Sequence, residues 1–286
     1  MAEATAPGSF AAQVAARVAT SGPLCAGIDP SVALLRQWGL ATDAGGLRQF
    51  GLRCVEAFAG VVPVVKPQVA FFERCGSAGL AALESVIAEA RSAGLLVIAD
   101  AKRGDIGSTM EAYAAAWLDP DSPLGADAVT AVPYLGLGAL QPMVDLAAAH
   151  GRGVIVVVRS SNPEGHLLQQ ALTDGGSGPA VEDRLLGEIA ALNGSDRVPT
   201  GTVGAVIGAT LEPSAFRLPQ LGGVILAPGV GAQGAGAAEV GRLFAGCPTG
   251  SVLASASRSI LGAGPDVDRL ATAARKVREE MTAVLA

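Results

Sequence analysis

The sequence predicts a single (β/α)8 barrel, the TIM-barrel class of α/β fold, over residues 1–286. Three observations predict it: short apolar runs recur along the whole chain, each run is rich in Val, Ile, Leu and Ala without polar alternation, and segments with helical periodicity separate them. Continuous apolar runs are typical of parallel strands, which are covered on both faces. Eight such units favour a closed barrel, and an open doubly wound sheet is the structural alternative.

The strands are expected at the apolar runs, most of which give way to glycine, proline or a polar residue. The runs are Pro23–Asp29, Val62–Pro67, Leu95–Asp100, Asp127–Pro133, Gly153–Arg159, Val203–Thr210, Gly222–Pro228 and Ser251–Ser255. The connection after the fifth run is long and contains polar Gly- and Asp-rich stretches. It predicts surface loops around an extra or lengthened helix, and no interdomain linker is visible.

Helices are expected between these strands and at both ends of the chain. An N-terminal helix is indicated by the helical spacing of Phe10, Val14 and Val18. Two internal apolar stripes consist of Leu80, Leu83, Val86, Ile87 and Ala90, and of Leu140, Val144 and Ala147. The last helix is expected to start at Pro265, with Asp266 and Asp268 near its positive end. Its apolar stripe is Val267, Leu270, Ala274, Val277, Met281 and Leu285.

Composition excludes several classes of function. The net charge of −6 argues against a broad nucleic-acid surface. The four cysteines are scattered without a CxxC pair, which fits reduced thiols in a cytoplasmic protein. No targeting segment is visible, and the uncharged stretch Leu218–Ala238 is broken by prolines and glycines, so no membrane association is expected.

Charged residues cluster at the end of the third strand. Asp100 and Lys102 follow the apolar residues 95–99, and strand alternation should point both side chains to one side. Catalytic groups of such barrels occupy the C-terminal ends of strands. The alternative is a salt bridge that caps the strand, with Asp105 as the N-cap of the next helix.

These residues also form a motif. The pattern D-x-K-x-x-D-[I/V]-[G/P]-x-T is matched by Asp100, Lys102, Asp105, Ile106, Gly107 and Thr109, and it resembles the signature of the orotidine 5′-phosphate decarboxylases. Further blocks are similar to that family, and the second of them resembles its longer bacterial branch. They are Gly27–Pro30, Val65–Glu73, Ser160–Gly165, Pro228–Gly234 and Ser257–Arg258.

The resemblance implies removal of CO2 from orotidine 5′-phosphate to give uridine 5′-monophosphate (UMP), the last step of de novo UMP synthesis, without metal or cofactor. It assigns Lys102 as the proton donor to C6, held by Asp100 and Asp105, with Lys66 in the same charged array. It also implies a homodimer in which Asp105 and Thr109 complete the neighbouring site. The remaining substrate contacts that it implies are Asp29 near the ribose, Ser161 and Pro228 at the base, and Gln233 and Arg258 at the phosphate.

A phosphate site is also indicated by position in the barrel. Such barrels often bind phosphate between the loops after strands seven and eight, where Gly229, Gly231, Gly234 and Arg258 lie. The same glycines spell G-x-G-x-x-G, but a dinucleotide site needs an acidic residue at the end of the next strand, and residues 254–257 supply none.

Two rival functions share this fold. Sister enzymes that act on keto-sugar phosphates with Mg2+ carry an acidic ligand on the second strand, where this chain has Lys66. A barrel that binds uridine nucleotides without catalysis is the second rival, although every expected catalytic residue is present. His150 and His166 are isolated, so no metal site is expected.

Overall fold

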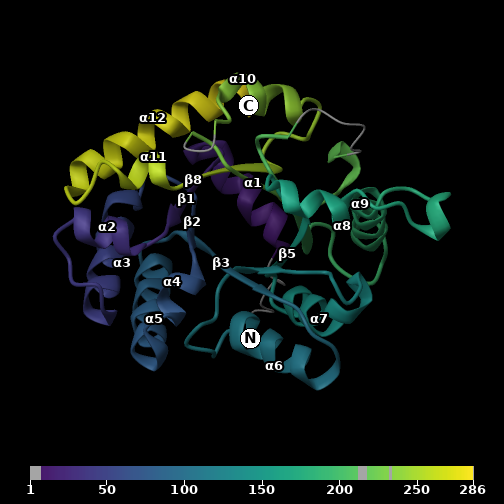
Figure 1. Cartoon of the computed structure of the whole chain (residues 1–286), viewed down its shortest axis with the longest axis horizontal. Helices are drawn as coiled ribbons and strands as arrows, with labels where there is room; N and C mark the ends of the chain where they lie inside the picture. Colours follow the sequence, from purple (N-terminus) through teal and green to yellow (C-terminus); the bar gives the residue numbers. More distant parts are fainter. Residues whose placement is uncertain (1–7, 212–217, 232–233, 286) are drawn as a thin grey trace, which may run out of the picture.

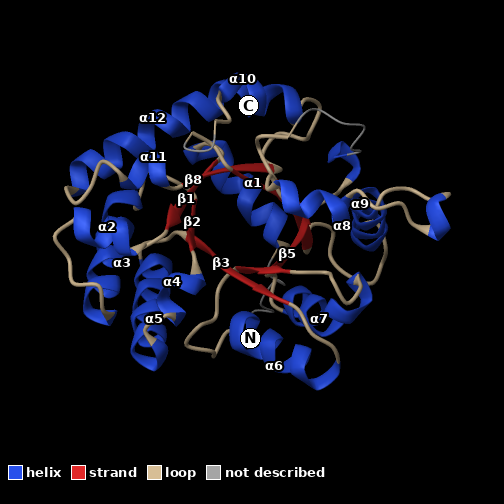
Figure 2. Cartoon of the chain, in the orientation of Figure 1, coloured by secondary structure: helices blue, strands red, loops and turns tan. Residues whose placement is uncertain are grey.

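The eight strands close into a parallel barrel, as predicted (Figures 1 and 2). The computed structural model describes residues 8–211, 218–231 and 234–285. Neighbouring strands pair in chain order, and β8 pairs with β1 to close the sheet. The strands are β1 Leu24–Ile28, β2 Val64–Pro67, β3 Leu96–Arg103, β4 Ala128–Ala131, β5 Gly153–Arg159, β6 Val203–Ile207, β7 Ile225–Pro228 and β8 Val252–Ala256.

Helices surround the barrel, as Figure 2 shows in blue around the red strands. The α-helices are α1 Phe10–Ser21, α2 Val32–Gln37, α3 Ala44–Phe58, α4 Val69–Glu73, α5 Gly76–Ser92, α6 Gly107–Leu118, α7 Gln141–Ala149, α8 His166–Gln169, α9 Val181–Asn193, α10 Ala237–Leu243, α11 Arg258–Leu261 and α12 Val267–Leu285. Short 3-10 helices are η1 Leu137–Leu140, η2 Pro163–Gly165, η3 Asp174–Gly176 and η4 Leu218–Gln220. The predicted stripes of α5, α7 and α12 contribute buried residues to the layer between helices and strands.

The N-terminal helix α1 closes one end of the barrel and lies across its axis in Figure 1. Its buried residues Phe10, Val14 and Val18 pack with side chains from inside the barrel. The Gln13 side-chain amide donates to the carbonyl of Gly151, just before β5, at 2.7 Å. This end is therefore the one where strands begin, and the opposite end, where catalytic groups collect, is left open.

The connection from β5 to β6 is held on the barrel by a buried ion pair. It contains η2, α8, η3 and α9. Arg159 Nε, at the end of β5, lies 3.2 Å from Glu182 Oε2 in the first turn of α9, and both side chains are less than a tenth exposed. Two buried charges that neutralise each other thus join the long connection to the strand it leaves.

Two predicted element boundaries differ from the structure. The last helix starts at Val267, not Pro265, because Asp266 Oδ1 accepts the backbone N–H of Arg269 at 2.9 Å and so lies before the first turn. β3 continues to Arg103, three residues past its predicted end, through an irregularity that shapes the site described below. Within the described residues, no helix is both long and apolar enough to cross a membrane.

Candidate active site

A cavity of about 290 Å³ opens at the C-terminal ends of the strands. It is lined by Asp29, Lys66, Gln68, Asp100, Lys102, Thr130, Val157, Ser160, Ser161, Val206, Leu226, Pro228, Gly229, Val230, Ser255, Ser257 and Arg258. The predicted site residues Asp29, Lys66, Asp100, Lys102, Ser161, Pro228 and Arg258 are all in this lining. Side chains far apart in the sequence therefore meet in one pocket, at the end of the barrel where it was predicted.

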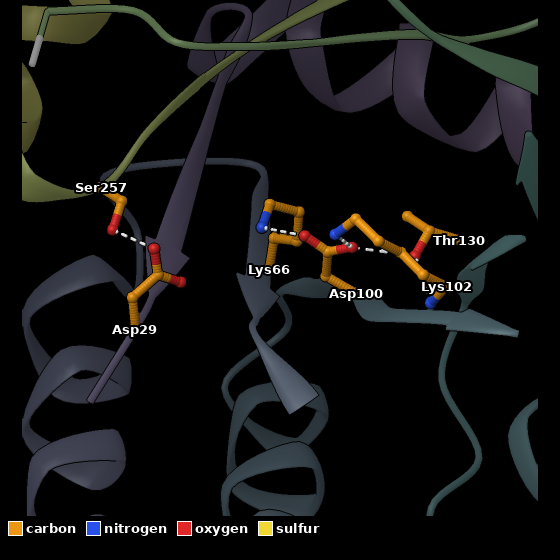
Figure 3. Close-up of polar contacts among 6 residues, drawn as sticks. All are labelled: Asp29, Lys66, Asp100, Lys102, Thr130 and Ser257. Atoms are coloured by element: carbon orange, nitrogen blue, oxygen red, sulfur yellow. Dashed lines mark hydrogen bonds and ion pairs between the residues drawn. The ribbon is translucent and has the colours of Figure 1, made fainter. Parts of the chain in front are cut away.

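The centre of the cavity is a charged array around Asp100 (Figure 3). Lys66 Nζ on β2 lies 2.7 Å from Asp100 Oδ2, and Lys102 Nζ lies 2.5 Å from Oδ1. The Asp100 and Lys66 side chains are 9% and 8% exposed, whereas the Lys102 side chain is 47% exposed. One carboxylate thus binds two ammonium groups, and that of Lys102 is the one a ligand can approach.

The array stays charged in spite of its burial. Burial by itself would lower the pKa of Lys66, but the carboxylates of Asp100 and Asp29 outweigh it and hold that pKa above the ordinary value of 10.5. Burial likewise favours neutral Asp100, but Lys66 and Lys102 outweigh it and hold the pKa of Asp100 below the ordinary 3.8. An acid and an amine therefore remain ionised together in a nearly dry site.

An irregularity in β3 turns both charged groups into the cavity. The pairing of β3 with β4 passes from Ala99 opposite Val129 to Arg103 opposite Ala131, so three residues of β3 face one residue of β4. Within this bulge Lys102 has a φ of 47°, in the left-handed region that side chains other than glycine rarely adopt. Such a backbone costs on the order of 1–3 kcal/mol and persists only where its surroundings hold it.

A second acidic group, Asp29, follows β1, the strand that pairs with the one carrying Lys66. The Ser257 hydroxyl donates a hydrogen bond to Asp29 Oδ2 at 2.5 Å (Figure 3). The other oxygen, Asp29 Oδ1, is buried and has no hydrogen-bond partner among the described residues. A buried carboxylate oxygen without a partner is costly, so this atom is suited to accept a hydrogen bond from a ligand hydroxyl.

The loop after β7 and the start of α11 form another part of the rim. Gly229 lines the cavity with a φ of 107°, a conformation that a residue with a side chain would adopt only under strain. Arg258, the first residue of α11, lines the same rim and supplies a guanidinium group that suits a phosphate. The predicted phosphate ligand Gln233 lies outside the described residues.

Two predicted site residues do not reach the cavity of their own chain. Asp105 Oδ1 accepts the backbone N–H of Ile106 at 2.8 Å, and Thr109 is exposed in the first turn of α6. The N-cap of α6 is Ile106, so the alternative in which Asp105 caps this helix is wrong. Neither Asp105 nor Thr109 lines the pocket that contains Asp100 and Lys102.

The sequence does not mark one polar group of the array, and it gives no role to one acidic residue near it. Thr130 on β4 contacts Asp100, but it lies inside an apolar run and no motif marks it. Glu73, at the end of α4, pairs with Arg103, whose guanidinium also lies 5.7 Å from the ring centroids of Tyr113 and Trp117. Glu73 therefore supports the end of β3 from outside the cavity.

Comparison with known proteins decides the family. The sequence model of the orotidine 5′-phosphate decarboxylase / HUMPS family matches residues 22–273. The chain belongs to this family. The resemblance in the sequence motifs is thereby confirmed, and the match extends from before β1 into α12.

Relatives within the orotidine 5′-phosphate decarboxylase / HUMPS family match over nearly the whole chain. The orotidine 5′-phosphate decarboxylase of Salinispora tropica is 51% identical over 277 residues, which are 97% of this chain and 98% of that protein. That of Corynebacterium efficiens is 52% identical over 264 residues, 91% of this chain and 92% of that protein. A crystal structure from Streptomyces avermitilis, provisionally assigned the same activity, has a TM-score of 0.92 and 45% identity and covers 100% and 99% of the two chains.

The described residues offer no alternative centre for a metal. No group of three or more His, Cys, Asp or Glu side chains lies close enough there to hold a metal ion. His150 caps the C-terminus of α7 and His166 is exposed at the start of α8. On β2, the strand that carries the acidic metal ligand in the sister enzymes, the structure places Lys66 within the charged array.

Proposed function

We propose that this chain converts orotidine 5′-phosphate to UMP and CO2, with Lys102 as the group that protonates C6. The observation that carries the proposal is the charged array of Asp100, Lys66 and Lys102 at the centre of the cavity. The relatives named as orotidine 5′-phosphate decarboxylases are about half identical over nearly the full chain, which supports the same substrate.

The phosphate and ribose would fix the nucleotide at the rim. Arg258 and the backbone around Gly229 would bind the phosphate, together with Gln233 from the segment outside the described residues. The unpartnered Asp29 Oδ1 would accept a ribose hydroxyl, with Lys66 close by. Ser161 and Pro228, which face the same cavity, would contact the pyrimidine. These contacts lie far from C6, so their binding energy can hold the reacting group in place.

In the chemical step, only charged groups of the protein are available to stabilise the negative charge that forms on the pyrimidine. The bond between C6 and the carboxylate breaks, CO2 leaves, and the electron pair stays at C6. The Lys102 ammonium would stabilise this negative charge and then transfer its proton to C6, giving UMP and a neutral amine that regains a proton from solvent. Because Asp100 keeps the ammonium in place before the reaction, little reorganisation is needed as the charge develops.

Asp100 would also act on the substrate directly. Its carboxylate lies beside the ammonium that must approach C6, so the substrate carboxylate would bind close to a like charge. This repulsion raises the energy of the bound substrate and is relieved when CO2 departs. The positive charges of Lys66 and Lys102 outweigh the effect of burial and hold the pKa of Asp100 low, so Asp100 stays ionised throughout; Lys66 also donates a hydrogen bond to its far oxygen.

We further propose that the active form is a homodimer in which Asp105 and Thr109 of one subunit complete the site of the other. These residues lie outside the cavity of their own chain. The loop from β3 to α6, which contains Asp105, starts beside the loop after β4, where Val132 N donates a hydrogen bond to Arg103 O at 2.9 Å. Three large apolar side chains on these two loops are exposed: Ile106 at 62%, Tyr134 at 76% and Leu135 at 54%. A second copy that covers them would bring Asp105 toward the neighbouring Lys102.

The direct test follows the loss of orotidine 5′-phosphate absorbance with purified protein, with and without EDTA. The proposal expects conversion to UMP at the same rate in both samples. Conversion that stops in EDTA would indicate metal-dependent chemistry. No conversion by a folded, dimeric sample would contradict the proposed activity, and sugar phosphates with Mg2+ would then be the next substrates to test.

A further inference from the structure

Thr130 occupies a special position in the barrel. It is the single residue of β4 between Val129 and Ala131, and it therefore faces the three residues of the β3 bulge, Asp100 to Lys102. Across a regular pair of strands, backbone groups would bind each other at this point. In the bulge this backbone hydrogen bonding is interrupted, and the side-chain hydroxyl of Thr130 binds the β3 residues where a backbone group otherwise would.

The Thr130 hydroxyl makes two hydrogen bonds, one to each charged residue of the bulge. It donates to Asp100 Oδ1 at 2.9 Å and accepts the backbone N–H of Lys102 at 2.9 Å. Figure 3 shows the threonine beside both residues, on the side of Asp100 away from Lys66. Thr130 is 1% exposed, so a side chain of the same volume without the hydroxyl leaves no space for a water molecule that could replace these bonds.

Both contacts bear on where the Lys102 ammonium lies. The bond to the backbone N–H holds Lys102 in its left-handed conformation, which sets the direction in which the side chain leaves the strand. The bond to Asp100 reaches Oδ1, the same oxygen that binds Lys102 Nζ. It therefore fixes the rotation of the carboxylate that binds the ammonium.

We propose that Thr130 is a positioning residue for the decarboxylation. Its single hydroxyl holds the Lys102 ammonium and the Asp100 carboxylate in fixed positions relative to each other. This inference rests on the proposed function, because it assigns Lys102 to C6. It predicts that any side chain of similar size without the hydroxyl loosens the pair, whereas serine, which keeps the hydroxyl, preserves it.

The test compares Thr130→Val, which keeps the shape and loses the hydroxyl, with Thr130→Ser. The matched control is Thr202→Val, because Thr202 is also 1% exposed and uses its hydroxyl for one hydrogen bond, to Pro199 O, at the opposite end of the barrel. We expect Thr130→Val to lower kcat by about 10- to 100-fold while UMP binds with nearly unchanged affinity. Thr130→Ser should stay within about threefold of the wild type, as should Thr202→Val. If Thr130→Val does not fold, Thr130→Ala can be used in its place, because it also lacks the hydroxyl and is smaller than valine.

A crystal structure of Thr130→Val separates this inference from the proposed function. In that structure Lys102 should have a changed φ, or its ammonium should have moved away from Asp100. This result does not depend on which substrate the enzyme converts. An unchanged Lys102 and Asp100 in that structure would overturn the inference, even if the wild type is active. So would a Thr130→Ser variant as impaired as Thr130→Val, or a loss of UMP affinity as large as the loss of kcat. Failure of the wild type to convert orotidine 5′-phosphate would overturn the proposed function instead.

Discussion

Lys66 Nζ lies 2.7 Å from Asp100 Oδ2, and both side chains are more than nine-tenths buried. A buried pair of this kind is costly to assemble and costly to break, because removal of one partner leaves the other as an uncompensated charge. The Asp100 carboxylate is thus needed both for the stability of the folded protein and for the proposed catalysis.

The stability requirement predicts a pH dependence for Asp100→Asn. In the wild type the pKa of Lys66 lies above its ordinary 10.5, so the stability it contributes is complete below that value and is lost only as the pH rises through the higher, folded-state pKa. Without the Asp100 carboxylate, burial is opposed by fewer charges and the pKa of Lys66 falls. Asp100→Asn should therefore lose about 3 kcal/mol of unfolding free energy at pH 7 and less at pH 10. Urea unfolding of both proteins at each pH measures this, and an equal loss at both pH values would contradict the explanation.

The Arg159–Glu182 pair makes a related prediction for the long connection after β5. Glu182→Ala leaves Arg159 buried without its partner, and should lower the free energy of unfolding by about 3–5 kcal/mol. The double variant Arg159→Met/Glu182→Leu should regain most of the loss, because it removes both charges. Glu188→Ala is the control, since it breaks an exposed pair with Arg184 on the same helix and should cost less than about 1 kcal/mol. Equal losses of unfolding free energy for Glu182→Ala and Glu188→Ala would mean that burial of the Arg159–Glu182 pair does not increase the cost of breaking it.

The barrel could be predicted from the sequence because its signal is repeated. Each of the eight strands lies within, or within a few residues of, an apolar run, since parallel strands covered on both faces need uniform hydrophobicity. Boundaries depend on single contacts and were less predictable. The continuation of β3 through Lys102 depends on pairing with β4, and the start of α12 depends on the side chain of Asp266.

The residues of the candidate site also differ in how well they could be predicted from the sequence. Lys66, Asp100 and Lys102 could be predicted because their charges interrupt or end apolar runs and match a family motif. Thr130 could not, because one threonine inside a buried strand is ordinary, and only the register of β4 against the bulge brings it to Asp100. Asp105 was predicted to act across a subunit boundary, and its place outside its own cavity leaves that prediction to experiment.

Arg258 is predicted to act through the phosphate group. Arg258→Ala should lower kcat/KM for orotidine 5′-phosphate by about 10- to 100-fold, the loss expected for charge-assisted hydrogen bonds. The loss should be much smaller with the nucleoside orotidine, which has no phosphate. Steady-state rates with the two substrates give the comparison. An equal loss on both would indicate that Arg258 shapes the site and does not bind the phosphate.

The homodimer proposal predicts complementation between two inactive variants. If Asp105 serves the neighbouring site, a mixed dimer of Lys102→Ala and Asp105→Asn contains one site with both changes and one intact site. Mixing the two under conditions that exchange subunits should then restore about a quarter of the wild-type activity, since half the dimers are mixed and each has one intact site.

The same mixture has a definite negative outcome. If Asp105 acted within its own subunit, every site would carry one of the two changes, and mixing would restore nothing. Each variant incubated with itself is the control for recovery during the exchange. Sedimentation of the mixture confirms that dimers have formed again before the activity is compared.

The most direct test of the account is the activity of Lys102→Ala beside its affinity for UMP. Lys102 is 47% exposed and lies at the edge of the buried array, so the truncated protein should fold and bind UMP through the phosphate and ribose contacts. Single-turnover measurements with excess enzyme should then detect no decarboxylation of bound orotidine 5′-phosphate. Substantial decarboxylation by this variant would contradict the assignment of Lys102 as the proton donor, and with it the proposed chemistry of the array.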